Sequence, residues 1–216
     1  MAPPARSEAE LIELARRGDG DAYVALVRLH QDLVFRTAYL VLGTAGDGIP
    51  ATSGEGGPAV EASVESPHGA AYDDAGNLYV PDGPGYLRRI DAETGVIETV
   101  AGVGTEGASG DGGAATRAAI DASKLLIGPD GSLYLVGGDP GGGEIRRIAP
   151  DGTIETVVGT GVLGENGEGL PATEIGILAS DVAIAPDGAL VFSQTEPEPA
   201  VRRVDPETGL VTTLVR

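Results

Sequence analysis

Cysteine is absent from this chain of 216 residues, which excludes disulfide frameworks, thiolate zinc sites and thiol nucleophiles. Large aromatic side chains are nearly absent too, with no tryptophan, two phenylalanines and six tyrosines. The core must therefore be built from Val, Ile, Leu and Ala. Only 14 basic residues stand against 33 acidic ones, and the net charge of −19 argues against a nucleic-acid-binding surface over the whole chain.

Long apolar segments are missing as well. The longest apolar run, residues 33–42, holds ten residues and includes Arg36, so it is too short to span a membrane. The first residues, Met1-Ala-Pro-Pro-Ala, lead into a charged segment rather than into the apolar stretch of a signal peptide. We therefore expect a cytoplasmic protein with no membrane contact.

Charge and glycine content change abruptly near Gly43. Residues 1–43 contain three glycines, five basic and six acidic residues. Residues 44–216 contain 32 glycines, nine basic and 27 acidic residues. The two segments predict two different domains, 1–43 and 44–216.

Residues 1–43 have the pattern of a small helical hairpin. Ser7 and Glu10 form a capping box at the start of a first helix, and Gly18 ends it. Apolar residues then recur at helical spacing along a second helix up to Gly43, at Ala22, Leu26, Leu29 and Leu33. Two helices expose too much apolar surface to stand alone, so we expect this hairpin to need a partner.

The same segment resembles a known family. Gly18-Asp19 precedes Ala22-Tyr23, and Gln31-Asp-Leu-Val-Phe-Arg36 follows. This pattern resembles the start of the second conserved region of extracytoplasmic-function RNA polymerase sigma factors. The clamp-binding and promoter-reading helices that should come next in that family do not follow, so the resemblance implies a truncated scaffold hairpin.

The rest of the chain is repetitive. Four markers recur with a period of about 57 residues, which indicates a repeat architecture. They are the strands 97–100, 154–157 and 211–214; the pairs Arg88-Arg89, Arg146-Arg147 and Arg202-Arg203; the turn glycines Gly76, Gly131 and Gly188; and the loop glycines Gly56, Gly112 and Gly169.

Each repeat contains four short strands. In the first repeat we place them at residues 69–72, 77–81, 86–90 and 96–101, separated by turns that contain glycine. Four such strands followed by one long loop are typical of a β-propeller blade. We predict a mainly β fold of three four-stranded blades, a partial propeller, preceded by the small α-helical hairpin. The predicted blades are residues 44–102, 103–159 and 160–216.

The repeats resemble a second known family. The matching stretches are residues 66–80, 87–91 and 95–102 and the loop Ser109-Gly-Asp-Gly-Gly-Ala-Ala-Thr116. They are similar to NHL-repeat propellers of the bacterial type whose blades are joined by a Ser-Gly-Asp-Gly-Gly-Pro-Ala-Thr-like loop. The tripeptide that names the family is replaced here by Gly85-Tyr-Leu and its counterparts.

No constellation of residues predicts chemistry. The glycine loops carry Glu55, Asp111 and Glu168 rather than basic residues, so they do not suit a phosphate. They could offer oxygen to calcium, but one or two carboxylates a loop favour a solvated blade connector. His30 and His68 are expected in surface or structural roles. We predict no catalytic, cofactor-binding or metal-ligating residue.

The paired arginines invite a nucleic-acid interpretation. Successive strand residues point to opposite faces, so each pair sends one arginine to each face and cannot form a basic stripe. We expect these arginines to bridge carboxylates on neighbouring blades, and we do not expect nucleic acid to bind the acidic blades.

Three blades are too few to close a propeller, which has roughly four to eight. Two flat aliphatic faces would remain open. We therefore expect a protein partner, a homodimer that completes a six-bladed ring, or a chain that is a fragment of a longer protein. The expected function is a non-catalytic protein-binding scaffold attached to a truncated sigma-like segment, in a regulatory or sensory protein. The alternative is an RNA polymerase sigma factor that binds the core enzyme in transcription initiation, and a propeller hydrolase or lyase ranks third.

Overall fold

The computed structural model describes residues 53–216 except 66, 68, 84, 138–142 and 165–166, together with residues 10, 14 and 17. The predicted hairpin, apart from these last three residues, lies outside the described residues, and so do His30 and His68. The chain divides into two compact units, Met1–Ala45 and Gly46–Arg216, and every strand among the described residues lies in the second. Within the described residues, no helix is both long and apolar enough to cross a membrane.

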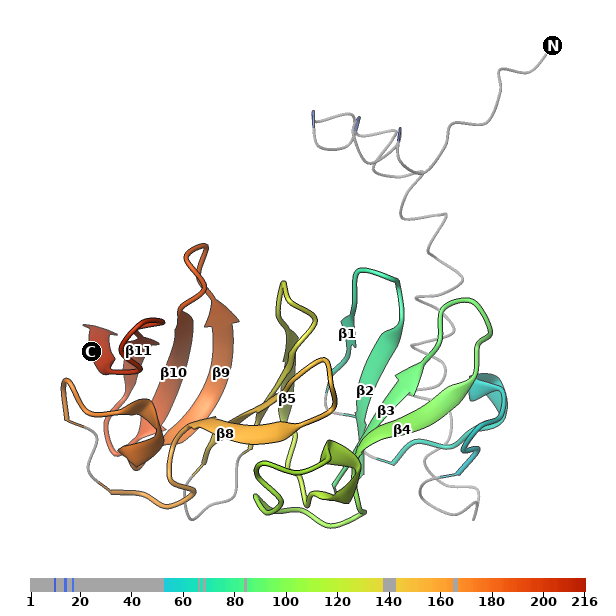
Figure 1. Cartoon of the computed structure of the whole chain (residues 1–216), viewed down its shortest axis with the longest axis horizontal. Coiled ribbons are helices and arrows are strands. Elements are labelled where there is room, and N and C mark those ends of the chain that lie inside the picture. The colour runs from blue at the N-terminus through green and yellow to red at the C-terminus, as the bar shows by residue number, and fades with distance from the viewer. Residues whose placement is uncertain are drawn as a thin grey trace. The chain divides into compact units, whose positions relative to one another are not determined.

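Three four-stranded antiparallel sheets form the second unit, each made of consecutive strands in chain order (Figure 1). Blade 1 consists of β1 (Ala71–Tyr72), β2 (Leu78–Asp82), β3 (Tyr86–Ile90) and β4 (Ile97–Gly102); blade 2 of β5 (Lys124–Ile127), β6 (Leu133–Val136), β7 (Ile145–Ile148) and β8 (Ile154–Val158); blade 3 of β9 (Leu178–Ile184), β10 (Leu190–Glu196), β11 (Ala200–Val204) and β12 (Val211–Val215). The predicted mainly β fold with three four-stranded blades is confirmed.

The turn between the first two strands of each blade depends on glycine. Gly76, Gly131 and Gly188 have φ angles of 87°, 79° and 85°, which residues with a side chain rarely adopt. The N–H of each glycine donates a hydrogen bond to the carbonyl three residues earlier, at 2.9, 2.9 and 2.8 Å. These closed turns fix where the inner hairpin of each blade reverses.

The blades stack side by side, and their first strands lie next to one another (Figure 1). The core between blades 1 and 2 includes Leu87 and Leu135, and the core between blades 2 and 3 includes Ile145 and Phe192. Except for Phe192, the fully buried apolar residues are aliphatic, as the composition predicts. Small branched side chains suit this arrangement because they fill the thin space between two flat sheets.

A connector precedes each blade and carries one turn of 3-10 helix. The three turns are η1 (Ala59–Glu61), η2 (Ala115–Arg117) and η3 (Ala172–Glu174). Each connector bridges to the last turn of the blade that follows it, through the pairs Pro58 with Val96, Ala114 with Thr153 and Pro171 with Leu210. The glycine loops of the sequence therefore fold back along the outer edge of a blade.

An arginine, a threonine and a carboxylate hold each connector in place, and we call this set a latch. The three latches are Arg88, Thr99 and Glu55; Arg146, Thr156 and Asp111; and Arg202, Thr213 and Glu168. The carboxylate accepts a hydrogen bond from the threonine backbone N–H, at 2.9, 2.8 and 3.0 Å respectively. The arginines are only 1%, 1% and 2% exposed.

The arginine of each latch also binds the connector. Arg88 Nη2 lies 3.2 Å from Glu55 Oε2, and Arg146 pairs with Asp111. Arg202 Nη2 donates to the Gly167 carbonyl at 3.1 Å. A buried guanidinium needs such partners because its desolvation is otherwise costly.

A β-bulge accompanies each latch. Arg88, Arg146 and Arg202 lie opposite the latch threonines, and the register shifts immediately before each arginine. The shift leaves one extra residue in the fourth strand, which is Val100, Val157 or Leu214. Latch and bulge thus recur together in all three blades.

These contacts confirm one prediction for the arginine pairs and correct another. The two arginines of a pair do point to opposite faces, since the Arg88 side chain is 1% exposed and that of Arg89 29%. Their carboxylate partners, however, lie in the same blade or its own connector, not on a neighbouring blade; Arg89, for example, pairs with Asp91 and Glu98. The connector folds back along its own blade, which places its carboxylate beside the buried arginine of that blade.

The latch leads to a stability prediction. Asp111→Ala should lower the free energy of unfolding by about 2–4 kcal/mol, because it leaves Arg146 buried without its carboxylate and the Thr156 N–H without an acceptor. Urea unfolding followed by circular dichroism would measure the loss. Glu106→Ala, an exposed change in the same connector, should cost less than about 0.5 kcal/mol. Equal losses in the two variants would contradict the role of the latch.

Candidate functional site

A depression of 780 Å³ lies where the first hairpins of the three blades meet. Strand ends and tight turns line it, because β1, β5 and β9 lie side by side and end at the same edge. Its lining residues are Tyr72, Asp73, Asp74, Ala75, Leu126, Ile127, Gly128, Pro129, Gly131, Ile184, Ala185, Pro186 and Gly188.

The lining positions correspond to one another across the repeats. Counted from the turn glycine of each blade, Tyr72 corresponds to Ile127 and Ile184. By the same count, Asp74 corresponds to Pro129 and Pro186. Blade 1 therefore contributes aromatic and acidic groups, whereas blades 2 and 3 contribute aliphatic side chains and proline rings. The depression has one polar side and one apolar side.

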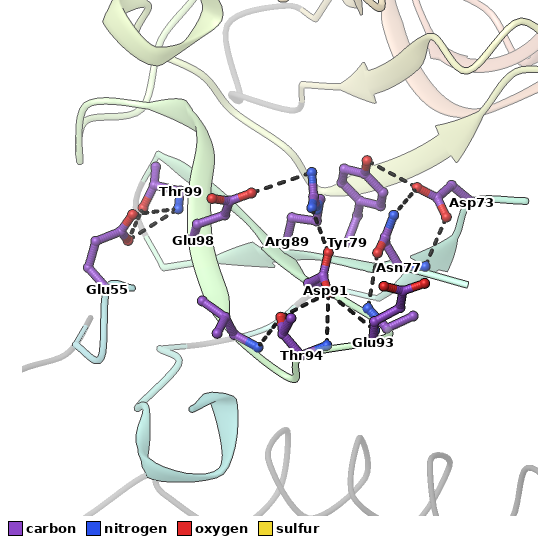
Figure 2. A network of polar contacts seen from close by, with 12 residues as sticks. Glu55, Asp73, Asn77, Tyr79, Arg89, Asp91, Glu93, Thr94, Glu98 and Thr99 are labelled. Atoms are coloured by element: carbon purple, nitrogen blue, oxygen red, sulfur yellow. Dashed lines mark hydrogen bonds and ion pairs between the residues drawn. The ribbon is translucent and has the colours of Figure 1, made fainter. Parts of the chain in front are cut away.

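Asp73 is held rigidly on the polar side (Figure 2). Its Oδ1 accepts hydrogen bonds from the backbone N–H groups of Ala75 and Asn77, at 3.0 and 2.8 Å, and its Oδ2 accepts from Asn77 Nδ2 at 2.8 Å and from the Tyr79 hydroxyl at 3.3 Å. Partial burial opposes ionisation, but these hydrogen bonds outweigh it and lower the pKa of Asp73 below its usual 3.8. Asp73 is therefore negatively charged at neutral pH, and Asp74 beside it is exposed.

A second acidic turn lies between β3 and β4 of the same blade (Figure 2). Asp91 Oδ1 accepts hydrogen bonds from the Thr94 backbone N–H at 2.9 Å and from the Thr94 hydroxyl at 2.8 Å. These bonds, with the ion pair to Arg89, lower the pKa of Asp91 from 3.8 to about 2. Asp205 makes the same turn with Thr208 in blade 3, and the hydrogen bonds from Thr208 lower its pKa.

The residues that the sequence singled out do not gather in the depression. Glu55, Asp111 and Glu168 lie in the latches, where their oxygens accept hydrogen bonds, so the connectors are fixed to the blades rather than merely solvated. Within the described residues, no group of three or more His, Asp or Glu is placed to hold a metal ion.

The depression itself was not predicted. Its residues were recognised only as the end of a predicted strand, 69–72, and as the turn Asp74-Ala-Gly76 with its counterparts, because each of these segments looks ordinary by itself. A comparison of equivalent positions across the repeats could have shown that Tyr72 and Asp74 replace the isoleucines and prolines of the other blades.

The sequence matches no protein-family model and no curated protein. Among solved structures, it is similar to a protein of unknown function from Bacteroides thetaiotaomicron, with 20% identity and a TM-score of 0.50 over 67% of this chain and 34% of that one. An auxiliary nutrient binding protein from the same organism gives 16% identity and a TM-score of 0.49 over 69% and 36%. TolB from Acinetobacter baumannii gives 18% identity and a TM-score of 0.44 over 67% and 31%.

These similar structures are propeller-like proteins of several blades, and the likeness concerns the fold. The chain spans about a third of the length of the solved structures that it matches.

The acidic turns predict how stability depends on pH. The pKa of Asp91 in the folded protein, about 2, is below its ordinary 3.8. Its ionised form therefore stabilises the fold above that ordinary value, and this contribution is lost as the pH falls toward about 2. Asp91→Asn should show a shallower loss of stability over this range in urea unfolding.

Asp205→Asn should behave in the same way, since Asp205 forms the equivalent turn. A pH profile of either variant that runs parallel to that of the unmodified protein would contradict this assignment.

Proposed function

We propose that the blades form a non-catalytic protein-binding module, and that the depression holds a partner segment in which an aliphatic side chain lies next to a basic one. The observation that carries this proposal is the division of the depression into an acidic side from blade 1 and an apolar side from blades 2 and 3.

Size and charge support a peptide segment as the occupant. A volume of 780 Å³ lies within the range of about 300–1,000 Å³ that is usual for ligand sites, and it can hold a few side chains. Asp73 and Asp74 are the charged groups among the described lining residues, so a cation is attracted and an anion repelled. The net charge of the chain, −19, adds to this preference.

The chemistry of the lining supports binding rather than catalysis. Among the described residues that line the depression, the titratable side chains are Tyr72, Asp73 and Asp74. Asp73 uses both carboxylate oxygens to hold its own turn. These hydrogen bonds lower the pKa of Asp73, which makes it a weak general base.

The resemblances in the sequence extend the proposal to the whole chain. The blades resemble NHL repeats, and residues 1–43 resemble the start of sigma-factor region 2. We propose a cytoplasmic regulatory or sensory protein in which the blades bind a protein partner and the sigma-like segment is a truncated scaffold.

A matched pair of peptides tests the depression. A capped hexapeptide of alternating leucine and lysine should bind, whereas one of alternating leucine and glutamate should not. Binding followed by NMR should shift the methyl signals of Ile127 and Ile184. Asp74→Asn should weaken binding by about threefold through the lost charge, and Ile184→Asn by about tenfold through the lost apolar contact.

Asp151→Asn is the control for this experiment, because Asp151 is an exposed turn residue outside the lining. It should leave the affinity unchanged. The proposal fails if both peptides bind equally well, or if Ile184→Asn and Asp151→Asn have the same effect.

The alternative function, transcription initiation, rests on the resemblance of residues 10–38 to sigma factors. It predicts that the full chain is retained by core RNA polymerase at low salt. The scaffold proposal predicts no retention, since the clamp-binding helix of that family is absent from the sequence. Co-purification with core enzyme, with an intact sigma factor as positive control, separates the two.

A further inference from the structure

Asp74, which lines the depression, forms no ion pair within the described part of the chain. The other two blades treat the carboxylate of this turn differently. There the residue before the turn glycine is Asp130 or Asp187. Arg147 Nη2 lies 3.0 Å from Asp130 Oδ2, and Arg203 pairs with Asp187. In blades 2 and 3 the third strand therefore neutralises the charge of the turn.

Blade 1 places its exposed carboxylate one position earlier. The residue before its turn glycine is Ala75, and Asp74 precedes it. Arg89, the blade 1 counterpart of the two arginines, pairs with Asp91 and Glu98 of its own blade instead (Figure 2). At the position of Asp74 the other blades have prolines, which also line the depression. The acidic group is thus separated from its arginine and placed in the wall of the depression, where it attracts a cation from outside the chain.

The neighbouring carboxylate of Asp73 is already occupied. Its two oxygens accept hydrogen bonds from Ala75, Asn77 and Tyr79, all within blade 1 (Figure 2). Asp74, by contrast, is exposed. Among the described lining residues, Asp74 is therefore the carboxylate that can offer both oxygens to a ligand.

An aromatic ring lies two residues before Asp74. Tyr72 is 43% exposed and lines the depression, where the other blades have Ile127 and Ile184. A ring and a carboxylate in one wall suit a guanidinium better than an ammonium group. A guanidinium is planar, stacks on aromatic faces and donates two parallel hydrogen bonds to one carboxylate. It is also less strongly hydrated, so it loses less when the apolar side of the depression displaces its water.

We propose that the depression selects arginine over lysine, with Tyr72 as the residue that determines this specificity and Asp74 as the ion-pair partner. The inference rests on the proposed function, because it names the basic side chain of the bound segment. In this arrangement the guanidinium stacks on the Tyr72 ring and donates to both oxygens of Asp74. The neighbouring aliphatic side chain of the segment then contacts the isoleucines of the apolar side.

Two capped hexapeptides test the selection, one of alternating leucine and arginine and one of alternating leucine and lysine. Isothermal titration calorimetry with the full chain should show about tenfold tighter binding of the arginine peptide. Tyr72→Ile, which introduces the residue found at the equivalent positions, should reduce this preference to about threefold because the ring is lost. Tyr72→Phe keeps the ring and should keep the tenfold preference.

Asp74→Asn tests the second contact. It should weaken the arginine peptide about tenfold and the lysine peptide about threefold, because only arginine loses a bidentate pair. Equal affinity of the two peptides for the unmodified protein would overturn the selection and leave the proposed binding function in place. Binding of neither peptide would overturn both. An unchanged preference in Tyr72→Ile would overturn the role of Tyr72.

Discussion

A buried guanidinium in the third strand of each blade is the interaction on which the arrangement of the sheets depends. Arg88, Arg146 and Arg202 are removed from water, so each must find acceptors nearby. The connector supplies them, and its carboxylate also caps a backbone N–H of the fourth strand. The same connector carries the small residues that cover the preceding blade. Fixing the connector to one blade thus shapes the surface that the previous blade contacts.

This interaction recurs with the same register shift in all three blades, and the depression takes its polarity from positions at which the side chains differ. The turn at the inner edge has the same hydrogen bond and the same glycine in each blade. Only blade 1 places Tyr72 and two aspartates there, while the other blades place isoleucine and proline. The equivalent turns of the three blades give the depression its shape. Tyr72 and the two aspartates of blade 1 give it a polar side.

The sequence by itself determined the local structure. The third strand was predicted at residues 86–90 and is found at Tyr86–Ile90, and the opposite directions of Arg88 and Arg89 followed from alternation. Such features depend on neighbours within a few residues. The tertiary structure alone decided that Arg146 meets a carboxylate 35 positions earlier, and that turns from three repeats form one depression. Those contacts depend on how a connector folds back and how sheets stack, which no local pattern encodes.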